Sequence, residues 1–255
     1  MFRQIFNTCR RVATACSQTM IEILPDHSDR FARLVGPEAD EVLEAMDEFG
    51  KENPPDWVER FPETDEFPTV GPAVGGWLQM LAGLTDAQRI FEFGSGFGYS
   101  AYWFARGLPS DGEIILTEVD EDELAMAREF LDRGGVDAVA RYELGDAFET
   151  LKQYDGPFDI VLLDHENDRY REAFESVRGK LADGGIVIAE NVMQAPSLEF
   201  DKLLSGLSNG DRPAGATEHT AGIFEYLDVV REDPAFETTA LPLGGGITVS
   251  RKTNE

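Results

Sequence analysis

The sequence predicts an α/β fold, with a doubly wound, mostly parallel sheet of seven strands that ends in an antiparallel hairpin. Three observations predict it. Short apolar runs alternate with helical patterns several times after residue 89, which is typical of βαβ units. A glycine-rich loop follows the first of these runs. Near the end of the chain, two β-rich segments are joined by Gly244, Gly245 and Gly246, which indicates a hairpin.

The chain before the sheet is expected to be helical. Apolar residues recur at three- and four-residue steps over 29–49, so one or two amphipathic helices are predicted there. A proline-rich, acidic connection follows, and then a helix through Trp77 and Leu81. We expect an extension or loosely packed helix at residues 1–21, a helical cover segment at 22–68 and the main domain at 69–255.

The elements of the main domain are predicted from their hydrophobic periodicity. The expected strands are residues 89–93, 113–118, 141–144, 158–163 and 185–190, with the hairpin at 236–243 and 247–250. The expected helices are residues 99–106, 122–133, 147–153, 168–181, 197–207 and 217–231.

The charge of the chain excludes several classes of partner. Lys and Arg number 22 against 49 Asp and Glu, so the formal net charge is −27 over 255 residues. Such a surface repels nucleic acid and anionic membranes, and no apolar run is long enough to span a bilayer. The acid excess is spread along the chain and lysine is scarce, which favours adaptation to high salt; an ordinary acidic protein is the alternative.

The first segment differs in composition from the rest. No acidic residue precedes Glu22, and both cysteines, Cys9 and Cys16, lie before it. A packed helix, a targeting peptide and an upstream extension with the start at Met20 are all open, although the apolar residues are too interrupted for a secretory signal. Because the main domain has no cysteine, no disulfide framework is available there, and a cytoplasmic location is expected.

Glycines follow the first strand at positions 94, 96 and 98. They let the backbone approach a ligand closely, and the helix that follows directs its amides at that ligand. The spacing differs from the dinucleotide fingerprint, and with Glu92 before it the loop suits the amino-acid end of S-adenosylmethionine (SAM) better than a pyrophosphate. A plain strand-to-helix turn is the alternative.

Acidic residues follow the next two strands. Glu118 ends the second strand, where a carboxylate accepts hydrogen bonds from ribose hydroxyls of NAD or SAM alike. Asp120 is predicted to cap the helix that follows. Asp146 and Ala147 come after the third strand, where an adenine would lie; a plain turn and cap is the other interpretation.

Five motifs, taken together, carry a family resemblance. They are Val70-Gly71-Pro72-Ala73, Glu92-Phe93-Gly94, Gly98-Tyr99-Ser100, Leu163-Asp164-His165-Glu166-Asn167-Asp168-Arg169-Tyr170 and Ile188-Ala189-Glu190-Asn191-Val192. In this order, and with the terminal hairpin, the chain from about residue 69 to 252 resembles the cation-dependent catechol and caffeoyl-CoA type O-methyltransferases, family 3 of the class I SAM-dependent enzymes. With the glycine loop and the acids described above, the resemblance implies SAM contacts at Val70, Glu92, Gly94, Ser95, Gly96, Gly98, Tyr99, Ser100, Glu118, Val119, Asp146, Ala147, Asp164 and His165.

The resemblance also implies a metal site, formed by Asp164 with Glu190 and Asn191. Oxygen ligands of this kind suit Mg²⁺ or another divalent cation. The family more usually has Asp where this chain has Glu190. In the alternative interpretation, Asp164 and Glu190 cap loops or touch the cofactor.

The general-base lysine of the family corresponds to Asn167, and an amide cannot take a proton from a phenol. By their positions in the motif, Asp164 and Asn167 are the catalytic candidates that the resemblance implies. Either the metal alone activates the acceptor, or Glu166 or His165 replaces the lysine. For His165, packing beside the adenine is the preferred role.

The expected function is methyl transfer from SAM to a hydroxyl of a small, catechol-like or vicinal-oxygen acceptor, with a divalent metal. Two alternatives remain: a metal-independent methyltransferase with another acceptor, and a SAM-binding protein that has lost catalysis. Neither nucleic acid nor a membrane is expected as a partner, and a homodimer is open.

Overall fold

The structure, a computed structural model, describes residues 31, 34–54 and 67–253. The predicted N-terminal extension at 1–21, with both cysteines, and most of the proline-rich connection lie outside the described residues. The predicted division of the chain at residues 68 and 69 stays a prediction.

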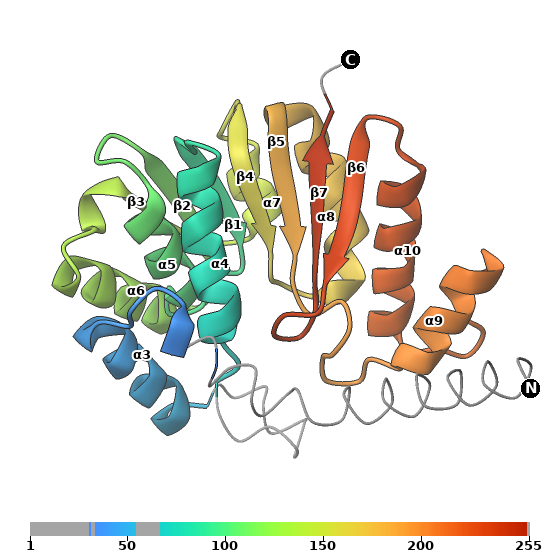
Figure 1. Cartoon of the computed structure of the whole chain (residues 1–255), viewed down its shortest axis with the longest axis horizontal. Helices are drawn as coiled ribbons and strands as arrows, with labels where there is room; N and C mark the ends of the chain where they lie inside the picture. Colours follow the sequence, from blue (N-terminus) through green and yellow to red (C-terminus); the bar gives the residue numbers. More distant parts are fainter. Residues whose placement is uncertain (1–30, 32–33, 55–66, 254–255) are drawn as a thin grey trace, which may run out of the picture.

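A seven-stranded sheet forms the centre of the molecule, in the order β3-β2-β1-β4-β5-β7-β6 (Figure 1). Strands β1 to β5 run parallel, and β7 pairs antiparallel with both β5 and β6. The predicted fold class is therefore confirmed. The strand bounds are β1 Arg89–Phe93, β2 Glu113–Glu118, β3 Ala140–Leu144, β4 Phe158–Leu163, β5 Leu181–Ala189, β6 Phe236–Leu241 and β7 Ile247–Lys252.

Helices cover both faces of the sheet. One face carries α3 (Glu41–Glu52), α4 (Gly71–Leu84), α5 (Tyr99–Gly107) and α6 (Glu121–Arg133). The other carries α7 (Ala147–Leu151), α8 (Tyr170–Val177), α9 (Phe200–Asn209) and α10 (Glu218–Glu232). Single 3-10 turns lie at η2 (Asp137–Val139), η3 (Asn167–Arg169) and η4 (Arg178–Lys180).

The alternation of side chains along the central strands separates two hydrophobic cores. In β4, Ile160 and Leu162 belong to the core under α3 to α6, whereas Val161 and Leu163 belong to the core under α7 to α10. All four side chains are fully buried. A strand apolar on both faces is what a sheet covered by helices on each side requires.

Several helices begin at aspartates that accept hydrogen bonds from the first turn. Asp120 Oδ1 accepts from the backbone nitrogens of Asp122 and Glu123, at 2.9 and 3.1 Å, so its predicted role as a cap is confirmed. Asp40 caps α3 in the same way and also accepts a 2.8 Å hydrogen bond from the Tyr102 hydroxyl. That contact fastens α3 to α5.

One predicted strand boundary is wrong. The helix predicted over 168–181 is present as the continuous helical run of η3, α8 and η4 from Asn167 to Lys180, but β5 begins at Leu181 rather than at residue 185. Leu181 pairs with Phe158, and a register shift then leads to the pair of Ile160 with Ile186, so the early part of β5 is irregular and hides the strand pattern.

The predicted start of the helix over 197–207 is wrong as well. Ser197 has a φ of 61°, outside the right-handed helical region, and α9 begins at Phe200.

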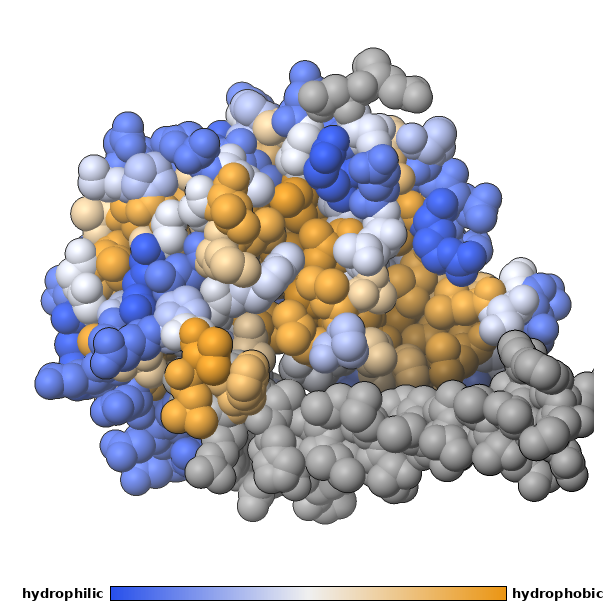
Figure 2. All heavy atoms as spheres, viewed as in Figure 1, coloured by the Kyte–Doolittle hydropathy of each residue, from blue (hydrophilic) through white to orange (hydrophobic). Residues whose placement is uncertain are grey.

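Apolar side chains gather between α4 and α10 on the face of the molecule shown in Figure 2, with hydrophilic side chains around them.

Within the described ranges, no helix is both long and apolar enough to cross a membrane.

Candidate active site

The candidate site lies where the carboxyl ends of β1, β4 and β5 meet. The strand order reverses beside β1, since β2 lies on one side of it and β4 on the other, and such switch points are where open α/β sheets bind ligands. Asp164 N donates to Phe93 O and Glu190 N donates to Leu163 O, each at 3.0 Å. The backbone therefore fixes Asp164 and Glu190 side by side.

Gly94 allows the ends of β1 and β4 to approach each other. Its φ is 78°, and a Cβ atom there would lie 2.5 Å from the Asp164 carbonyl oxygen. Only glycine fits this position, both because of its backbone conformation and because of the close neighbour. The glycine at position 94 is thus required by the contact between two strand ends, and the predicted approach of this loop to a ligand stays a prediction.

Glu92 is fully buried at the end of β1. Burial raises the pKa of its carboxyl to about 8; Ser100 lowers this pKa and the charge of Asp164 raises it further. Within the part of the chain that the structure describes, neither carboxylate oxygen has a partner in hydrogen-bond geometry. A buried carboxylate without a partner is costly, so this group is suited to a positively charged ligand.

Glu118 organises the glycine loop after β1. Its Oε2 accepts a 2.9 Å hydrogen bond from Gly96 N, and its Oε1 accepts from Val119 N and Asp120 N at 2.7 and 3.1 Å. The carboxylate is thereby held at the ends of β1 and β2 with lone pairs left for further donors. The Val119 side chain beside it is 73% exposed.

The start of α5 continues the loop. Gly98, with a φ of 85°, is the N-cap, and a Cβ atom there would lie 2.8 Å from Ala127 Cβ on α6. The packing of α5 against α6 therefore also requires a glycine at position 98. Ser95, Tyr99 and Ser100 are buried, and the Ser95 hydroxyl has no hydrogen-bond partner among the described residues.

Phe67 is a site residue that sequence reasoning missed. Its ring edge would lie 3.1 Å from a Cβ atom on Gly96, and it packs edge-on against Phe97 with centroids 4.8 Å apart. It belongs to the proline-rich connection, whose composition gives no signal of a contact with the glycine loop.

Asp164, Glu190 and Asn191 lie together as predicted. Asn191 Nδ2 donates to Asp164 Oδ1 at 3.2 Å. Burial raises the pKa of Asp164 to about 7, and burial together with the charge of Asp164 raises the pKa of Glu190 well above its usual value. Two carboxylates that repel each other in a buried position, next to an amide, are a donor set that a divalent cation would satisfy.

The turn between β6 and β7 closes over this cluster. A Cβ atom on Gly245 would lie 2.3 Å from Asn191 Oδ1, and one on Gly244 would lie 3.1 Å from Glu190 Oε1 and 3.3 Å from Val70 O. Val70, the N-cap of α4, is thus brought to the site from the other side. Asn191 itself has a φ of 58°, a conformation that Asn tolerates better than most residues.

His165 lies among aromatic rings. Its ring stacks on Tyr170, with centroids 5.2 Å apart, and lies 5.2 Å from Phe93 and 5.6 Å from Phe148. Burial lowers the pKa of His165 to about 3, and neither ring nitrogen has a partner among the described residues. This imidazole is neutral at physiological pH and a weak proton acceptor.

Asn167 is 7% exposed and meets a residue that the sequence analysis did not single out. Its Oδ1 lies 3.4 Å from Nδ1 of His219, the second residue of α10. The neighbouring Tyr170 hydroxyl donates to Glu190 O at 3.2 Å; burial raises the pKa of Tyr170 well above its usual value, and Asn167 opposes that shift. His219 is 52 residues from Asn167 in sequence, and no motif links them.

Asp146 and Ala147 form the start of α7. Asp146 Oδ1 accepts from Phe148 N and Glu149 N at 2.8 and 3.1 Å, so this residue is a helix cap. Partial burial would raise the pKa of Asp146, but these hydrogen bonds and Arg169 hold it below its usual value.

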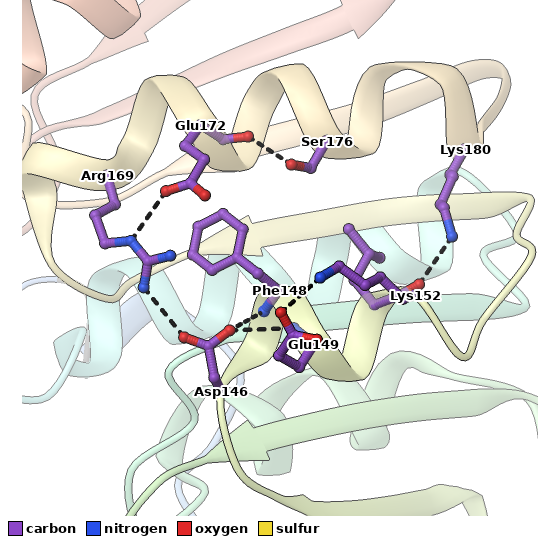
Figure 3. A pocket seen from close by; sticks show the side chains of 9 residues that line it. Asp146, Phe148, Glu149, Lys152, Arg169, Glu172, Ser176 and Lys180 are labelled. Atoms are coloured by element: carbon purple, nitrogen blue, oxygen red, sulfur yellow. Dashed lines mark hydrogen bonds and ion pairs between the residues drawn. The ribbon is translucent and has the colours of Figure 1, made fainter.

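Arg169 links Asp146 on one side to Glu172 on the other, at 3.1 and 3.0 Å (Figure 3). Its guanidinium also lies over the Phe148 ring, 3.9 Å from the ring centroid. These side chains line a pocket of about 600 Å³ between α7 and α8, which contains none of the glycine-loop residues. The pocket thus borders the candidate site only through Asp146 and Phe148.

The described residues contain no cluster of three or more His, Cys, Asp or Glu side chains suited to a metal. The predicted ligands, Asp164, Glu190 and Asn191, include only two residues of these four types, because the third is an asparagine. The arrangement offers the Glu118 carboxylate at the end of β2, the buried carboxyl of Glu92 and an oxygen-rich cluster at the ends of β4 and β5.

Comparisons with known proteins find relatives of this chain. A family model described as O-methyltransferase matches residues 63–253. A catechol O-methyltransferase from Niastella koreensis is 35% identical over 130 residues, which cover 49% of this chain and 59% of that protein. One from Mycobacterium tuberculosis is 27% identical over 179 residues, covering 70% of this chain and 73% of that protein.

A solved structure of an O-methyltransferase from Bacillus cereus, in complex with SAH, has the same fold. Its TM-score is 0.73 at 24% identity, covering 89% of this chain and 97% of that one.

Proposed function

The chain belongs to the O-methyltransferase family and is a SAM-dependent enzyme, and on this premise we propose that it methylates a hydroxyl of a small, catechol-like acceptor with the help of a divalent cation. The observation that carries the proposal is the contact of Asn191 with Asp164 beside Glu190, at the strand ends that adjoin the glycine loop. The names of two relatives, both catechol O-methyltransferases, support the acceptor class.

The residues assigned to SAM are those predicted from the sequence. The unpartnered carboxylate of Glu92 supports a contact with the cofactor's positive charge, because a buried anion gains most from a nearby cation. Glu118, with lone pairs left over from its backbone contacts, suits the ribose hydroxyls. The aromatic surroundings of His165 suit a nucleobase. The proposed set is Val70, Glu92, Gly94, Ser95, Gly96, Gly98, Tyr99, Ser100, Glu118, Val119, Asp146, Ala147, Asp164 and His165.

Asp164, Glu190 and Asn191 fit a divalent cation by their chemistry. Hard cations prefer carboxylate and amide oxygens, and a positive charge would relieve the repulsion between the two acids. When bound, such a cation would favour the deprotonated form of an acceptor hydroxyl. The two oxygens of a vicinal diol suit such a site, which favours a catechol over a monophenol.

The reaction is an in-line displacement. The acceptor oxygen forms a bond to the methyl carbon, the bond from that carbon to sulfur breaks with its electron pair left on sulfur, and the acceptor hydroxyl loses its proton. The protein's part is to align oxygen, carbon and sulfur and to receive the charge and the proton that the step displaces.

The proposal is tested by turnover. The purified protein is incubated with SAM, Mg²⁺ and a panel of catechol, 3,4-dihydroxybenzoate and caffeate, each beside its monophenol counterpart, and methyl ethers are measured by mass spectrometry. We expect methylation of the diols and much slower methylation of the monophenols. Equal rates on both sets would contradict the vicinal-oxygen acceptor. SAM binding without transfer to any acceptor would indicate a protein that has lost catalysis.

A further inference from the structure

We propose that His219 is the general base that takes the proton from the acceptor hydroxyl, and that Asn167 positions its ring. This inference rests on the proposed O-methylation. It begins from the contact between Asn167 Oδ1 and His219 Nδ1 at 3.4 Å. An imidazole is the side chain best suited to accept a proton near neutral pH.

The hydrogen bonds around Asn167 select the tautomer of His219. An amide oxygen accepts hydrogen bonds and cannot donate them. In its contact with Asn167 Oδ1, Nδ1 of His219 is therefore the donor and carries the proton. The other ring nitrogen, Nε2, carries the lone pair. An oxygen acceptor that fixes a histidine tautomer in this way is how catalytic histidines are oriented elsewhere.

The packing of α10 holds this arrangement. Gly222 lies one turn after His219, and a Cβ atom on it would lie 2.3 Å from Asp168 Cα and 2.7 Å from Asn167 O. Only glycine lets α10 lie directly on η3 at this point. Tyr226, one turn further on the same helix, packs edge-on against Tyr170 with centroids 5.9 Å apart. The face of α10 that carries His219 is therefore fixed against the segment that follows β4.

The two other candidates for this role are less suitable. His165 has both ring nitrogens buried among aromatic rings, and Glu166 is exposed to solvent. His219 is half-buried and contacts Asn167, which stands at the position of the family's lysine. The ionisable groups on the elements packed around it include Glu218 and Glu225 on α10, Asp168 and Arg169 on η3, Tyr170 on α8, and Glu199 and Lys202 at the start of α9.

The acceptor O–H bond breaks and its proton moves to Nε2 of His219, while the oxygen bonds to the methyl carbon and sulfur keeps the electron pair of the broken bond. The imidazolium then returns its proton to water. No oxidant or reductant is needed.

The test compares His219→Gln with Glu218→Gln, a matched control on the neighbouring exposed residue. Methyl transfer to catechol is measured from pH 5.5 to pH 9, and SAH binding is measured by calorimetry. We expect His219→Gln to lose about 10²- to 10⁴-fold in rate, as is typical for a general base, and to lose the low-pH limb of its profile. SAH affinity should be unchanged, and Glu218→Gln should match the wild type. A His219→Gln variant with the wild-type rate and profile would overturn the proposal.

A second measurement varies the acidity of the acceptor, to which a purely structural role of His219 would be insensitive. The loss of methylation rate in His219→Gln should be smaller with 4-nitrocatechol than with catechol, because a more acidic phenol needs less help to lose its proton. An equal loss of rate on both acceptors would overturn the proposal. The tautomer of His219 is read by NMR without SAM or acceptor: we expect Nδ1–H in the wild type and a change in Asn167→Leu. An Nε2–H tautomer in the wild type would overturn the role of Asn167.

Failure of the proposed O-methylation and failure of the proposed role of His219 give different results. A wild type that binds SAM but methylates no hydroxyl fails the proposed function and this inference with it. A wild type that methylates catechol while His219→Gln does so equally fails this inference alone.

Discussion

Asn191 donates a hydrogen bond to Asp164 at 3.2 Å, although the two residues follow different strands and lie 27 residues apart in the sequence. The contact exists because β4 and β5 are parallel neighbours whose carboxyl ends meet at one edge of the sheet. It joins Asp164, which borders Gly94 of the glycine loop, to Asn191, over which the turn between β6 and β7 closes.

Removing the charge of Asp164 should abolish most catalysis while the cofactor still binds. Asp164→Asn keeps the size of the side chain but removes one of the two carboxylates proposed to bind the cation, so we expect a large loss of kcat with SAH affinity within a few-fold of wild type. Asp168→Asn, an exposed neighbour on η3, serves as the matched control. A wild-type kcat in Asp164→Asn would argue against the metal role.

Chelation should act in the same direction. With EDTA present, we expect methylation of catechol to stop and to return on addition of Mg²⁺ or Mn²⁺ in excess of the chelator. Rates are followed by mass spectrometry of the methyl ether. Full activity in EDTA would move the assignment to a metal-independent enzyme.

Glu118→Ala should weaken cofactor binding by about 1 to 3 kcal/mol, because charge-assisted hydrogen bonds to the ribose are lost. Part of the effect will come from the loop, since Gly96, Val119 and Asp120 lose their common acceptor. Calorimetry with SAH measures the affinity and a thermal melt without ligand measures the loop contribution, with Glu121→Gln as an exposed control. Binding of NAD in place of SAM would overturn the cofactor assignment.

The buried carboxyl of Glu92 should make stability depend on pH. Because its pKa is raised from 4.5 to about 8, the folded state binds a proton that the unfolded state has released, so this residue's contribution is fully present below pH 4.5 and is lost as the pH rises through 8. Glu92→Gln removes that dependence. Urea melts of the ligand-free protein should show the variant gaining stability relative to the wild type between pH 5 and pH 8.5. Parallel pH profiles for the two proteins would contradict the raised pKa.

Salt should stabilise the fold. The net charge of −27 favours unfolding by self-repulsion in dilute buffer, and the Debye length falls from about 10 Å at 0.1 M to about 3 Å at 1 M salt. We expect Tm to rise between 0.1 and 2 M KCl by more than sucrose of equal osmolality produces. A Tm that does not respond to KCl would remove the interpretation of salt adaptation.

The strand-end residues could be predicted because the carboxyl ends of parallel strands lie at the same edge of a sheet, even when the strands are far apart in the sequence. Glu92, Glu118 and Asp164 each follow or end an apolar run, so the alternation of elements alone placed them at one edge. The pattern also predicted the bounds of β1, β2 and β4. The irregular start of β5 carries no periodic signal, since its register shift breaks the alternation.

Phe67 and His219 could not be predicted in the same way. Phe67 reaches Gly96 from a connection without periodicity, and His219 meets Asn167 through the packing of one helix on a short turn. Such contacts depend on tertiary packing, which the local pattern does not encode. Gly222 was the available signal, as a glycine inside a helical pattern often marks a close approach.

The turn over Asn191 has a consequence for the order in which the protein is made. Val192 N and Met193 N donate to the carbonyl oxygens of Gly246 and Gly245, and β7 inserts between β5 and β6. During translation, β1 to β5 leave the ribosome well before Gly245 does, and the edge of β5 then has no neighbour in the sheet. The strand-end cluster is therefore completed only late in synthesis, and a nascent chain halted before β7 exposes an unpaired, apolar strand edge to other chains.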